Sequence, residues 1–274
     1  MVAEKKRIDV LLVEKGFFDS REKARAALMA GEVMVNGQLA DKPGQRVDAH
    51  QTNIIVKPKM PYVSRGGYKL ARALQVFPID MPGKVVLDIG ASTGGFTDCA
   101  LQNGAAAVYA VDVGYGQMAW SLRSDPRVTV LERTNIRYME RDVFIKGMPD
   151  LVTIDVSFIS LTLVLPRLDY LLDKYEGVAL VKPQFEAGRG VVGKKGVVKD
   201  PGVHREVLQK VVQSAGGLGI AVLGIDYSPI KGPEGNIEYL LHFKKPASAP
   251  GGLNELIVRA VSEAHRNLSG GSEH

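Results

Sequence analysis

Short runs of apolar, often β-branched residues alternate with segments of helical periodicity between residues 84 and 243. Such runs suit strands that are buried on both faces, and the segments between them are long enough to return the chain to the same edge of a sheet. The alternation therefore predicts a doubly wound α/β domain whose sheet is largely parallel. The predicted strands are Val85–Ile89, Val108–Val111, Val128–Leu131, Leu151–Asp155, Val178–Lys182, Ala221–Tyr227 and Ile237–Phe243. The predicted helices between them span residues 93–103, 116–123, 160–173 and 203–215.

The first predicted strand leads into a turn of small residues and then into a helix. Asp88 lies near the end of the strand, and the turn from Gly90 to Gly95 precedes the apolar helix. Glycines let backbone N–H groups approach a ligand, and a helix N-terminus favours negative charge. Asp112, at the end of the second strand, follows Asp88 by 24 residues. Doubly wound folds use that offset to place a carboxylate on the ribose hydroxyls of a nucleotide.

The residues of this turn leave several interpretations open. The turn lacks the G-x-G-x-x-G pattern, so a dinucleotide site has only partial support. Gly90 to Gly94 matches the G-x-S-x-G elbow of α/β-hydrolases, in which Ser92 would be the nucleophile. Two strand-end acids around a small-residue turn are also typical of an S-adenosylmethionine (SAM) site. An ordinary turn without a ligand is the simplest alternative.

Composition excludes several classes of protein. Cys99 is the only cysteine of the 274 residues, so no intrachain disulfide can form. No apolar run is long enough for a transmembrane helix, and the charged N-terminus does not have the form of a signal peptide. A mean hydropathy of −0.01 and 45% hydrophobic residues are typical of a soluble globular protein. We therefore expect a cytoplasmic protein.

The positive charge is concentrated at the start of the chain. Residues 1–75 contain 14 Lys and Arg against 8 Asp and Glu, whereas the remainder contains 21 against 22. A basic module attached to a nearly neutral body favours a polyanion as a partner, although a solvated basic surface would give the same count.

The basic module has a recognisable pattern of its own. Residues 7–15 and 20–30 have helical spacing, Val33–Val35 and Thr52–Lys57 read as strands, and Asn36-Gly37 predicts a type I′ turn. This arrangement resembles the S4 RNA-binding domain. The residues that carry the resemblance are Arg7-Ile8-Asp9, Ser20-Arg21, Ala24, Gly31, Val33, Val35-Asn36-Gly37, Lys42-Pro43-Gly44 and Val47. The resemblance implies that basic side chains of this module contact RNA phosphates. We expect those side chains to be Arg7, Arg21, Lys23 and Arg25.

Polar residues follow several of the predicted strands, at the edge where open α/β sheets bind ligands. Asn135 follows the third strand, where the adenine of a nucleotide would lie. Asp155 and Lys182 follow the fourth and fifth strands, and Glu238 lies within the seventh. A charge among apolar strand residues is costly unless it is paired or functional.

The strand-end residues carry a second resemblance. Lys69, Asp155, Lys182 and Glu238 are similar to the Lys–Asp–Lys–Glu tetrad of FtsJ-like ribose 2′-O-methyltransferases. Together with the S4-like module, the chain resembles the TlyA family of rRNA 2′-O-methyltransferases, whose members are often labelled haemolysins. The resemblance implies a Rossmann-like, seven-stranded methyltransferase fold whose last strand is inserted antiparallel. The short segment Ser228–Asn236 between the last two strands suits that arrangement.

The same resemblance implies the chemistry. SAM would be the methyl donor, and the acceptor would be a ribose 2′-OH, of a cytidine, in ribosomal RNA or a ribosomal subunit. Lys182 would accept or orient the hydroxyl proton, Lys69 would supply a second positive charge, and Asp155 and Glu238 would position the lysines. The residues expected at the cofactor are Asp88, Gly90, Ser92, Gly94, Gly95, Phe96, Asp112, Asn135 and Asp155. Arg65, Lys194 and Lys195 are further expected RNA contacts.

The resemblance sets the expected domains at residues 1–58 for the S4-like module, 59–63 for a linker and 64–274 for the methyltransferase. Three alternatives remain. A hydrolase would need one of the histidines His204, His242 and His265 beside Ser92. A nucleotide triphosphatase would need a P-loop, and Gly188–Lys195 lacks its final hydroxyl. A protein that binds RNA or lyses membranes without methyl transfer is the third. No histidine or cysteine spacing indicates a metal site, and both a monomer and a homodimer are compatible with the sequence.

Overall fold

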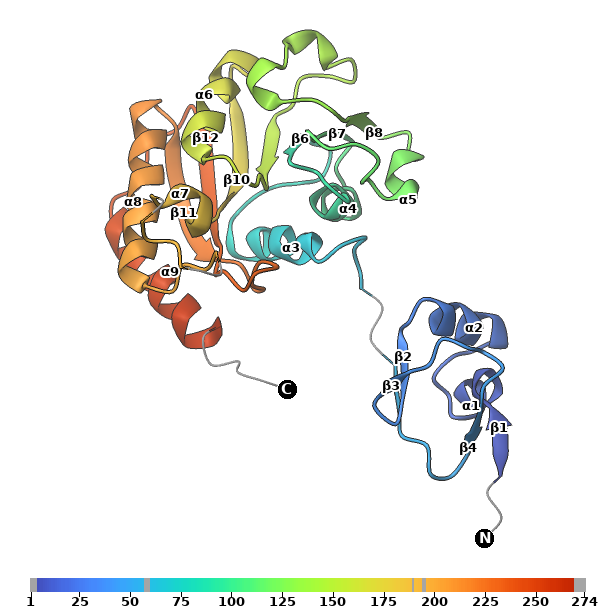
Figure 1. Cartoon of the computed structure of the whole chain (residues 1–274). Helices are drawn as coiled ribbons and strands as arrows, with labels where there is room; N and C mark the ends of the chain where they lie inside the picture. Colours follow the sequence, from blue (N-terminus) through green and yellow to red (C-terminus); the bar gives the residue numbers. More distant parts are fainter. Residues whose placement is uncertain (1–3, 57–59, 189, 194–195, 269–274) are drawn as a thin grey trace. The chain divides into compact units, whose positions relative to one another are not determined.

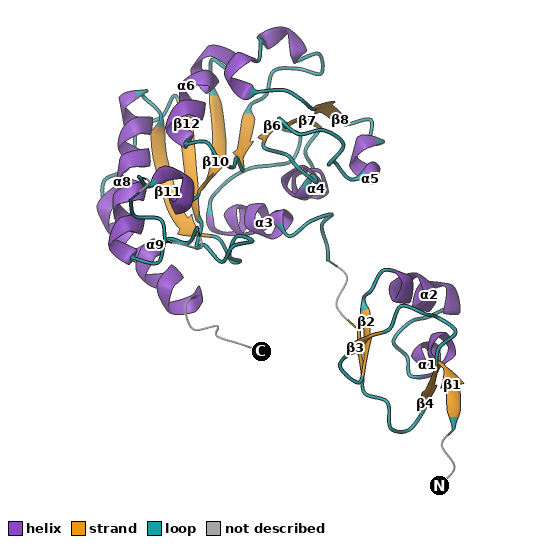
Figure 2. Cartoon of the chain, viewed as in Figure 1, coloured by secondary structure: helices purple, strands orange, loops and turns teal. Residues whose placement is uncertain are grey.

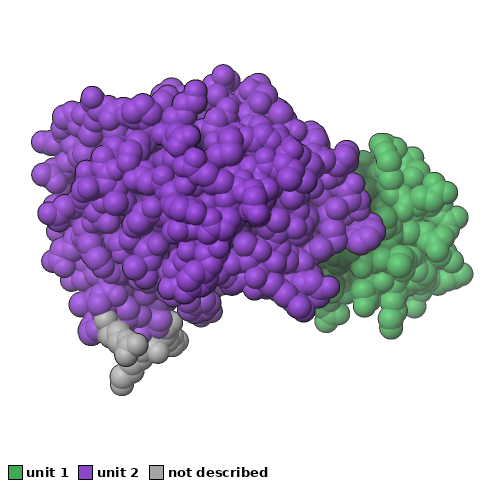
Figure 3. Space-filling model, turned by 90° about the horizontal axis from the view of Figure 1, so that it is seen from above, with its two compact units in different colours: residues 1–61 green, residues 62–274 purple. Residues whose placement is uncertain are grey.

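The computed structural model of the chain describes residues 4–56, 60–188, 190–193 and 196–268. The chain divides into two compact units, Met1–Pro61 and Tyr62–His274, which Figure 3 distinguishes by colour. Each unit has its own hydrophobic core, so each is described by itself.

The first unit packs two short helices on small sheets, as the sequence predicts. Ser20 caps the second helix by accepting a hydrogen bond from the Lys23 amide. Asn36 and Gly37 have φ values of 50° and 79°, which confirms the predicted type I′ turn. An additional pair of strands, β1 and β4, is antiparallel and was not anticipated. The elements are β1 (Lys5–Arg7), α1 (Ile8–Glu14), α2 (Arg21–Met29), β2 (Val33–Val35), β3 (Gln38–Leu39), β4 (Arg46–Asp48) and β5 (Ile54–Val56).

The second unit contains a seven-stranded mixed sheet in the order β11-β12-β10-β9-β6-β7-β8. Strand β12 is antiparallel to both of its neighbours, whereas β10, β9, β6, β7 and β8 are parallel to one another. This topology confirms the Rossmann-like methyltransferase fold with its inserted antiparallel strand. The strands are β6 (Val85–Ile89), β7 (Ala107–Val111), β8 (Val128–Leu131), β9 (Leu151–Ile154), β10 (Tyr175–Val181), β11 (Ala221–Tyr227) and β12 (Tyr239–Lys245).

Helices cover both faces of this sheet, as Figures 1 and 2 show. Successive residues of β6 point to opposite faces, because Val86 belongs to one apolar cluster and Leu87 to the other. The Leu87 cluster includes residues of α6, α8 and α9, and the Val86 cluster includes residues of α3, α4 and α5. The helices are α3 (Gly66–Val76), α4 (Gly95–Gln102), α5 (Trp120–Arg123), α6 (Leu161–Leu171), α7 (Pro183–Glu186), α8 (Pro201–Gly217) and α9 (Leu253–Leu268), with 3₁₀ turns η1 (Ile136–Tyr138) and η2 (Arg141–Val143).

Several predicted boundaries were wrong. The helix predicted over 116–123 is only the four residues of α5, because the segment before it forms a loop in which the Gly116 amide donates to Glu132 Oε1 and the Ala119 amide donates to the Thr93 carbonyl oxygen. The helix predicted to begin at residue 93 begins at Gly95, since Gly94 has a left-handed φ of 98°. The strand predicted to begin at Ile237 begins at Tyr239, and β10 ends at Val181, before Lys182.

Candidate active site

Four charged side chains meet at one edge of the sheet of the second unit. Asp155 and Lys182 follow the carboxyl ends of β9 and β10. Glu238 immediately precedes β12, and because that strand is antiparallel, its start lies at the same edge. Lys69, in the first turn of α3, reaches them from one face of the sheet. The fold therefore gathers residues that are separated by up to 169 positions in the chain.

The four side chains form a continuous series of ion pairs. Lys69 Nζ lies 2.6 Å from Glu238 Oε2 and 3.6 Å from Asp155 Oδ2. Lys182 Nζ lies 2.6 Å from Asp155 Oδ1 and donates a hydrogen bond of 3.0 Å to Ser157 Oγ. The structure thus brings together the four residues that the sequence suggested as a tetrad, in the order Glu238–Lys69–Asp155–Lys182.

Burial makes this cluster energetically significant. The Glu238 side chain is 1% exposed, and those of Lys69 and Lys182 are 9% and 10% exposed. Buried charges are tolerated only when they are paired, and here two lysines balance two carboxylates. Lys69 faces two carboxylates, whereas Lys182 faces one carboxylate and a hydroxyl. Lys182 is therefore the less neutralised of the two cations.

Two glycines allow close packing beside the cluster. Gly90 has a φ of 88°, and a Cβ atom there would lie 2.4 Å from the Asp155 carbonyl oxygen. The turn can therefore pass directly over the end of β9 only because residue 90 lacks a side chain. A Cβ atom at Gly232 would lie 2.7 Å from Glu238 Oε1. Gly90 therefore permits the close approach to the Asp155 backbone, and Gly232 leaves room for the Glu238 carboxylate.

Asp88 is fully buried below the turn. Its carboxylate accepts hydrogen bonds from Thr97 Oγ1 at 2.6 Å and Thr153 Oγ1 at 2.8 Å. Burial raises the pKa of this carboxyl to about 6, and the two hydroxyl donors oppose the shift. Asp88 thus ties β6 to α4 and to β9. Its expected contact with the cofactor stays a prediction, and its buried position indicates an indirect one.

Asp112 organises the loop at the end of β7. Its Oδ2 accepts the Ser92 amide at 2.8 Å, and its Oδ1 accepts the Gly114 amide at 2.7 Å. Ser92 has a φ of 49°, and its hydroxyl donates to Gln117 Oε1 at 3.1 Å. Asn135, after β8, caps η1 by accepting the Arg137 amide. Gly90, Ser92, Asp112 and Asn135 therefore lie along one edge of the sheet, partly open to solvent.

Two other predicted cofactor residues have packing roles. Phe96 is 3% exposed in the apolar cluster below α3. A Cβ atom at Gly95 would lie 2.3 Å from Ser64 Oγ. The absence of a side chain at residue 95 lets the segment before α3 pack against the turn, which places Lys69 at the sheet edge.

The histidines do not support the hydrolase interpretation. His204 is fully buried and bonds to the Tyr239 hydroxyl and the Val198 carbonyl oxygen, and burial lowers its pKa to about 4. His265 contacts His204, and His242 pairs with Glu176. Each histidine of the predicted set therefore has partners other than Ser92.

Sequence reasoning missed an aromatic pair beside the cluster. Phe158 is 90% exposed although it has a φ of 64°, a conformation that a bulky residue rarely adopts. Its ring centroid lies 4.9 Å from that of Phe185, and Lys182 Nζ lies 6.0 Å from the Phe185 centroid. The position of Phe158 three residues after Asp155 was the only available signal.

The predicted RNA contacts have different surroundings. In the first unit, Arg7 and Arg21 both pair with the buried Asp9, and Lys23 pairs with the exposed Asp19. Arg25 is exposed on α2. In the second unit, Arg65 donates to the Lys231 carbonyl oxygen. Lys194 and Lys195 lie outside the described residues.

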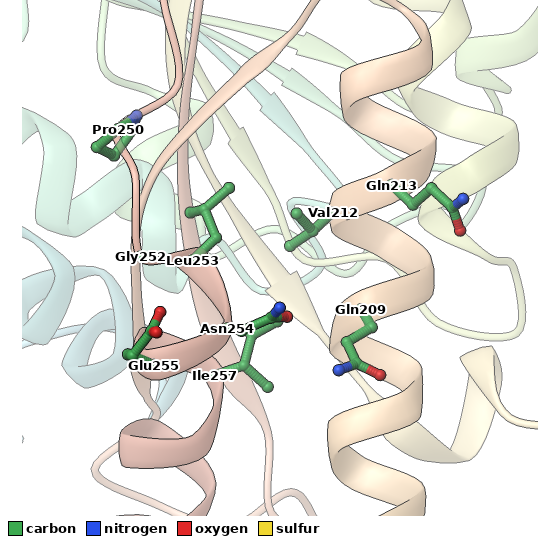
Figure 4. A pocket seen from close by; sticks show the side chains of 9 residues that line it. All are labelled: Gln209, Val212, Gln213, Pro250, Gly252, Leu253, Asn254, Glu255 and Ile257. Atoms are coloured by element: carbon green, nitrogen blue, oxygen red, sulfur yellow. The ribbon is translucent and has the colours of Figure 1, made fainter.

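A groove of about 660 Å³ lies between α8 and the start of α9. Figure 4 shows its lining, in which Val212 of α8 points toward Leu253, and Gln209 and Gln213 are the other lining residues of that helix. It shares no residue with the charged cluster. Within the described ranges, no helix is long and apolar enough to cross a membrane, and no group of three His, Cys, Asp or Glu residues could hold a metal.

Comparisons with known proteins agree with this geometry. The family described as FtsJ-like methyltransferase matches residues 62–245, and the S4 domain family matches residues 6–53. The chain is 53% identical over 272 residues to "Putative rRNA methyltransferase YqxC" of Bacillus subtilis, covering 98% of this chain and 97% of that protein. It is 45% identical over 267 residues to "16S/23S rRNA (cytidine-2'-O)-methyltransferase TlyA" of Mycobacterium tuberculosis, covering 96% and 99%.

A solved structure supports the same relationship. "Putative hemolysin from Streptococcus thermophilus" has a TM-score of 0.76 and 47% identity to this chain, and the match covers 98% of each chain. The matches extend through both the S4 domain and the methyltransferase domain. The chain therefore belongs to the TlyA family of FtsJ-like methyltransferases that carry an N-terminal S4 domain.

Proposed function

We propose that this protein transfers a methyl group from SAM to the ribose 2′-OH of a cytidine in ribosomal RNA, which its S4 domain helps to bind. The observation that carries the proposal is the buried series Glu238–Lys69–Asp155–Lys182 at the carboxyl edge of the sheet. The relative from Mycobacterium tuberculosis is named for cytidine 2′-O-methylation of 16S and 23S rRNA, which supports this choice of substrate.

The edge that includes Gly90 and Asp112 fits SAM. Asp112 is held by two backbone amides and is partly open to solvent, as a partner of two ribose hydroxyls must be. Gly90, Ser92 and Gly94 would surround the methionine end, and Asn135 would lie at the adenine. Asp88 would act indirectly, by holding the turn to β9. Bound there, SAM supplies an electrophilic methyl group.

The charged cluster would act on the acceptor. A ribose hydroxyl is a weak acid, so its oxygen must be oriented before it reacts. As the O2′–methyl bond forms, the sulfur–methyl bond breaks, S-adenosylhomocysteine is the leaving group, and the hydroxyl proton would pass to solvent water. Lys182 is the less neutralised cation and would face the hydroxyl. Asp155 positions Lys182 by direct contact, and Lys69 and Glu238 hold Asp155 in place. Positioning of this kind supplies much of the rate in a direct transfer.

The exposed ring of Phe158 would receive the nucleobase. Bases of RNA that leave their stack are commonly held on aromatic side chains. Phe158 lies three residues after Asp155, so a base on its ring would bring the attached ribose close to Lys182.

The test uses tritiated SAM with unmodified 30S and 50S ribosomal subunits, followed by digestion and separation of nucleosides. We expect label in 2′-O-methylcytidine. The variant Lys182→Ala should lose at least about 10²-fold in rate, while equilibrium dialysis shows unchanged SAM binding, because Lys182 contacts the acceptor. Lys174→Ala, an exposed lysine just before β10, is the matched control and should keep full activity.

Two results would contradict the proposal. One is the absence of any 2′-O-methylated nucleoside in either subunit. The other is full activity of Lys182→Ala, which would remove the cluster from the reaction.

A further inference from the structure

The segment after β9 and the turn α7 after β10 contact each other at the edge of the sheet. The two strands are parallel neighbours, so residues 155–160 and α7 both leave the sheet at its carboxyl edge. One contact between them is the pair of rings of Phe158 and Phe185, 4.9 Å apart. A second contact is buried and belongs to Glu186, which the proposed reaction does not use.

Glu186 binds the segment after β9 at the start of α6. The residue is 4% exposed. Its Oε1 accepts the Leu161 amide at 2.7 Å, and its Oε2 accepts the Ser160 hydroxyl at 2.5 Å. The first amides of a helix have no partner within that helix, and a carboxylate beside them also interacts favourably with the helix dipole. A side chain of α7 therefore fixes where α6 begins, two residues after Phe158.

Glu186 is itself fixed to the rest of the unit. Lys210 of α8 donates from Nζ to the Glu186 carbonyl oxygen at 3.0 Å. The amides of Phe185 and Glu186 donate to the Lys182 carbonyl oxygen at 2.9 and 3.3 Å, which closes α7 into a single turn. This turn therefore has Lys182 at one end and the anchor of the Phe158 segment at the other.

Phe158 needs such an anchor. Its φ of 64° is a conformation that a bulky residue keeps only where its surroundings impose it, and its ring is 90% exposed. The contact with the Phe185 ring orients the side chain but does not fix the backbone. Glu186 restrains the backbone two and three residues further on, at Ser160 and Leu161.

We propose that Glu186 is a positioning residue for the acceptor nucleotide, because it anchors the start of α6 and so holds the ring of Phe158 beside Lys182. This inference rests on the proposed function, in which Phe158 receives the nucleobase and Lys182 faces the ribose hydroxyl. The base and the hydroxyl belong to one nucleotide, so the groups that hold them must be fixed relative to each other. Glu186 is buried and acts only through the Phe158 segment.

The variant Glu186→Ala removes both contacts to the start of α6. With saturating unmodified subunits, kcat should fall about tenfold, since a misplaced group can cost up to about 10²-fold in rate. The KM for subunits and the Kd for SAM, measured by equilibrium dialysis, should stay close to their wild-type values. Glu186→Gln should restore most of kcat, because its amide oxygen can accept the Leu161 amide and its NH₂ group can donate to Ser160 Oγ. A folded Glu186→Ala variant with the wild-type kcat would overturn the inference.

A double-mutant cycle shows whether Glu186 acts through Phe158. Phe158→Ala alone should lower kcat, because it removes the ring that receives the base. Once the ring is absent its position no longer matters, so Glu186→Ala should cause little further loss in that background. Losses that multiply would show that Glu186 acts through another group and would overturn the inference.

Hydrogen exchange of the full-length protein without RNA measures the anchor directly. In Glu186→Ala, the amides of residues 157–161 should exchange faster than in the wild type, whereas those of residues 88–98 should not change. Unchanged exchange of residues 157–161 would overturn the inference whatever the activity. Absence of ribose methylation by the wild type would refute the proposed reaction instead, and the exchange would then decide by itself whether Glu186 holds this segment.

Two controls and a milder variant accompany these measurements. Val164→Ala removes volume from the buried face of α6, leaves both contacts of Glu186 in place, and should keep the wild-type kcat well below its melting temperature. A purely structural role predicts that Glu186→Ala behaves like Val164→Ala. Glu206→Ala removes an exposed carboxylate from α8 and should change neither kcat nor exchange. If Glu186→Ala does not fold, Ser160→Ala removes one of the two contacts and should lower kcat about threefold. Wild-type kcat and exchange in Ser160→Ala would then count against the inference.

Discussion

Replacing Glu238 by glutamine should destabilise the second unit strongly while leaving its shape almost unchanged. Glu238 is the closer of two carboxylates to Lys69, at 2.6 Å against 3.6 Å for Asp155. Without it, three charges remain at the sheet edge and the buried cluster has a net positive charge. Lys69 at the start of α3 also opposes the helix dipole, so it depends on these carboxylates for compensation.

The distances set the size of the effect. With an effective dielectric constant of about 20, charges separated by 2.6 Å and 3.6 Å attract by about 6 and about 5 kcal/mol before any desolvation cost. Asp155 therefore retains part of the attraction after Glu238 is neutralised. Breaking a buried pair by removing one partner costs about 3–5 kcal/mol, and we expect the lower end for Glu238→Gln, about 3 kcal/mol.

A double-mutant cycle tests the origin of this cost. Lys69→Met alone leaves two carboxylates with only Lys182, and it should also destabilise the unit. The double variant removes a charge of each sign. The unfolding free energy that it loses should therefore be about 2 kcal/mol smaller than the sum of the losses of the two single variants. All three variants should lose methyl transfer, because each removes a side chain of the series that holds Asp155 in place. The double variant restores neutrality but not the contact of Lys69 with Asp155.

Urea unfolding of the isolated second unit, followed by circular dichroism at about 222 nm, measures these values because the unit contains the helices α3 to α9. The single tryptophan, Trp120, is unsuitable as a fluorescent probe because it is 78% exposed in the folded unit. Glu234→Gln, an exposed glutamate four residues earlier, is the matched control and should change stability by no more than about 0.5 kcal/mol. A cost below about 1 kcal/mol for Glu238→Gln, or strict additivity in the cycle, would refute the view that these charges depend on each other.

The remaining predictions concern the turn after β6. Gly90→Ala should lower stability by at least about 2 kcal/mol, from the left-handed φ and the 2.4 Å approach to the Asp155 carbonyl oxygen, and should reduce methyl transfer by displacing Asp155. Urea unfolding and the SAM assay measure both effects, and a fully active, stable variant would contradict the close approach. Asp88→Asn should remove a decline in stability that the wild type shows as the pH rises from about 4 to about 6.

The sheet could be predicted from the sequence because its strands are buried on both faces. Continuous apolar runs result, and three predicted strands, β6, β8 and β11, match the structure residue for residue. The helix predicted over 116–123 was wrong because its apolar spacing competes with tertiary hydrogen bonds. The Gly116 amide donates to Glu132 Oε1 and the Ala119 amide donates to the Thr93 carbonyl oxygen, which keeps residues 116–119 as a loop.

The candidate active site could be predicted only in part from the sequence. The identity of the four charged residues followed from a family resemblance, and their ion pairs depend on a fold that joins distant segments. The exposed Phe158 was missed because the local sequence does not predict a left-handed backbone conformation for a bulky residue. The ion pair between the buried Asp9 and Arg21 was missed because Arg21 lies on another helix, and sequence patterns do not show such hydrogen bonds.

The pH dependence expected for Asp88 has a definite sign. Burial raises the pKa of its carboxyl from 3.8 to about 6, so between these values the folded protein holds a proton that the unfolded chain has released. Stability therefore falls as the pH rises through this window and is constant above it, and the total loss from this group is about 3 kcal/mol. Asp88→Asn has no such proton, so the wild-type stability minus the variant stability should decline by about that amount between pH 4 and pH 7. A difference that does not vary with pH, or that varies only below pH 4, would show that the hydroxyls of Thr97 and Thr153 outweigh burial.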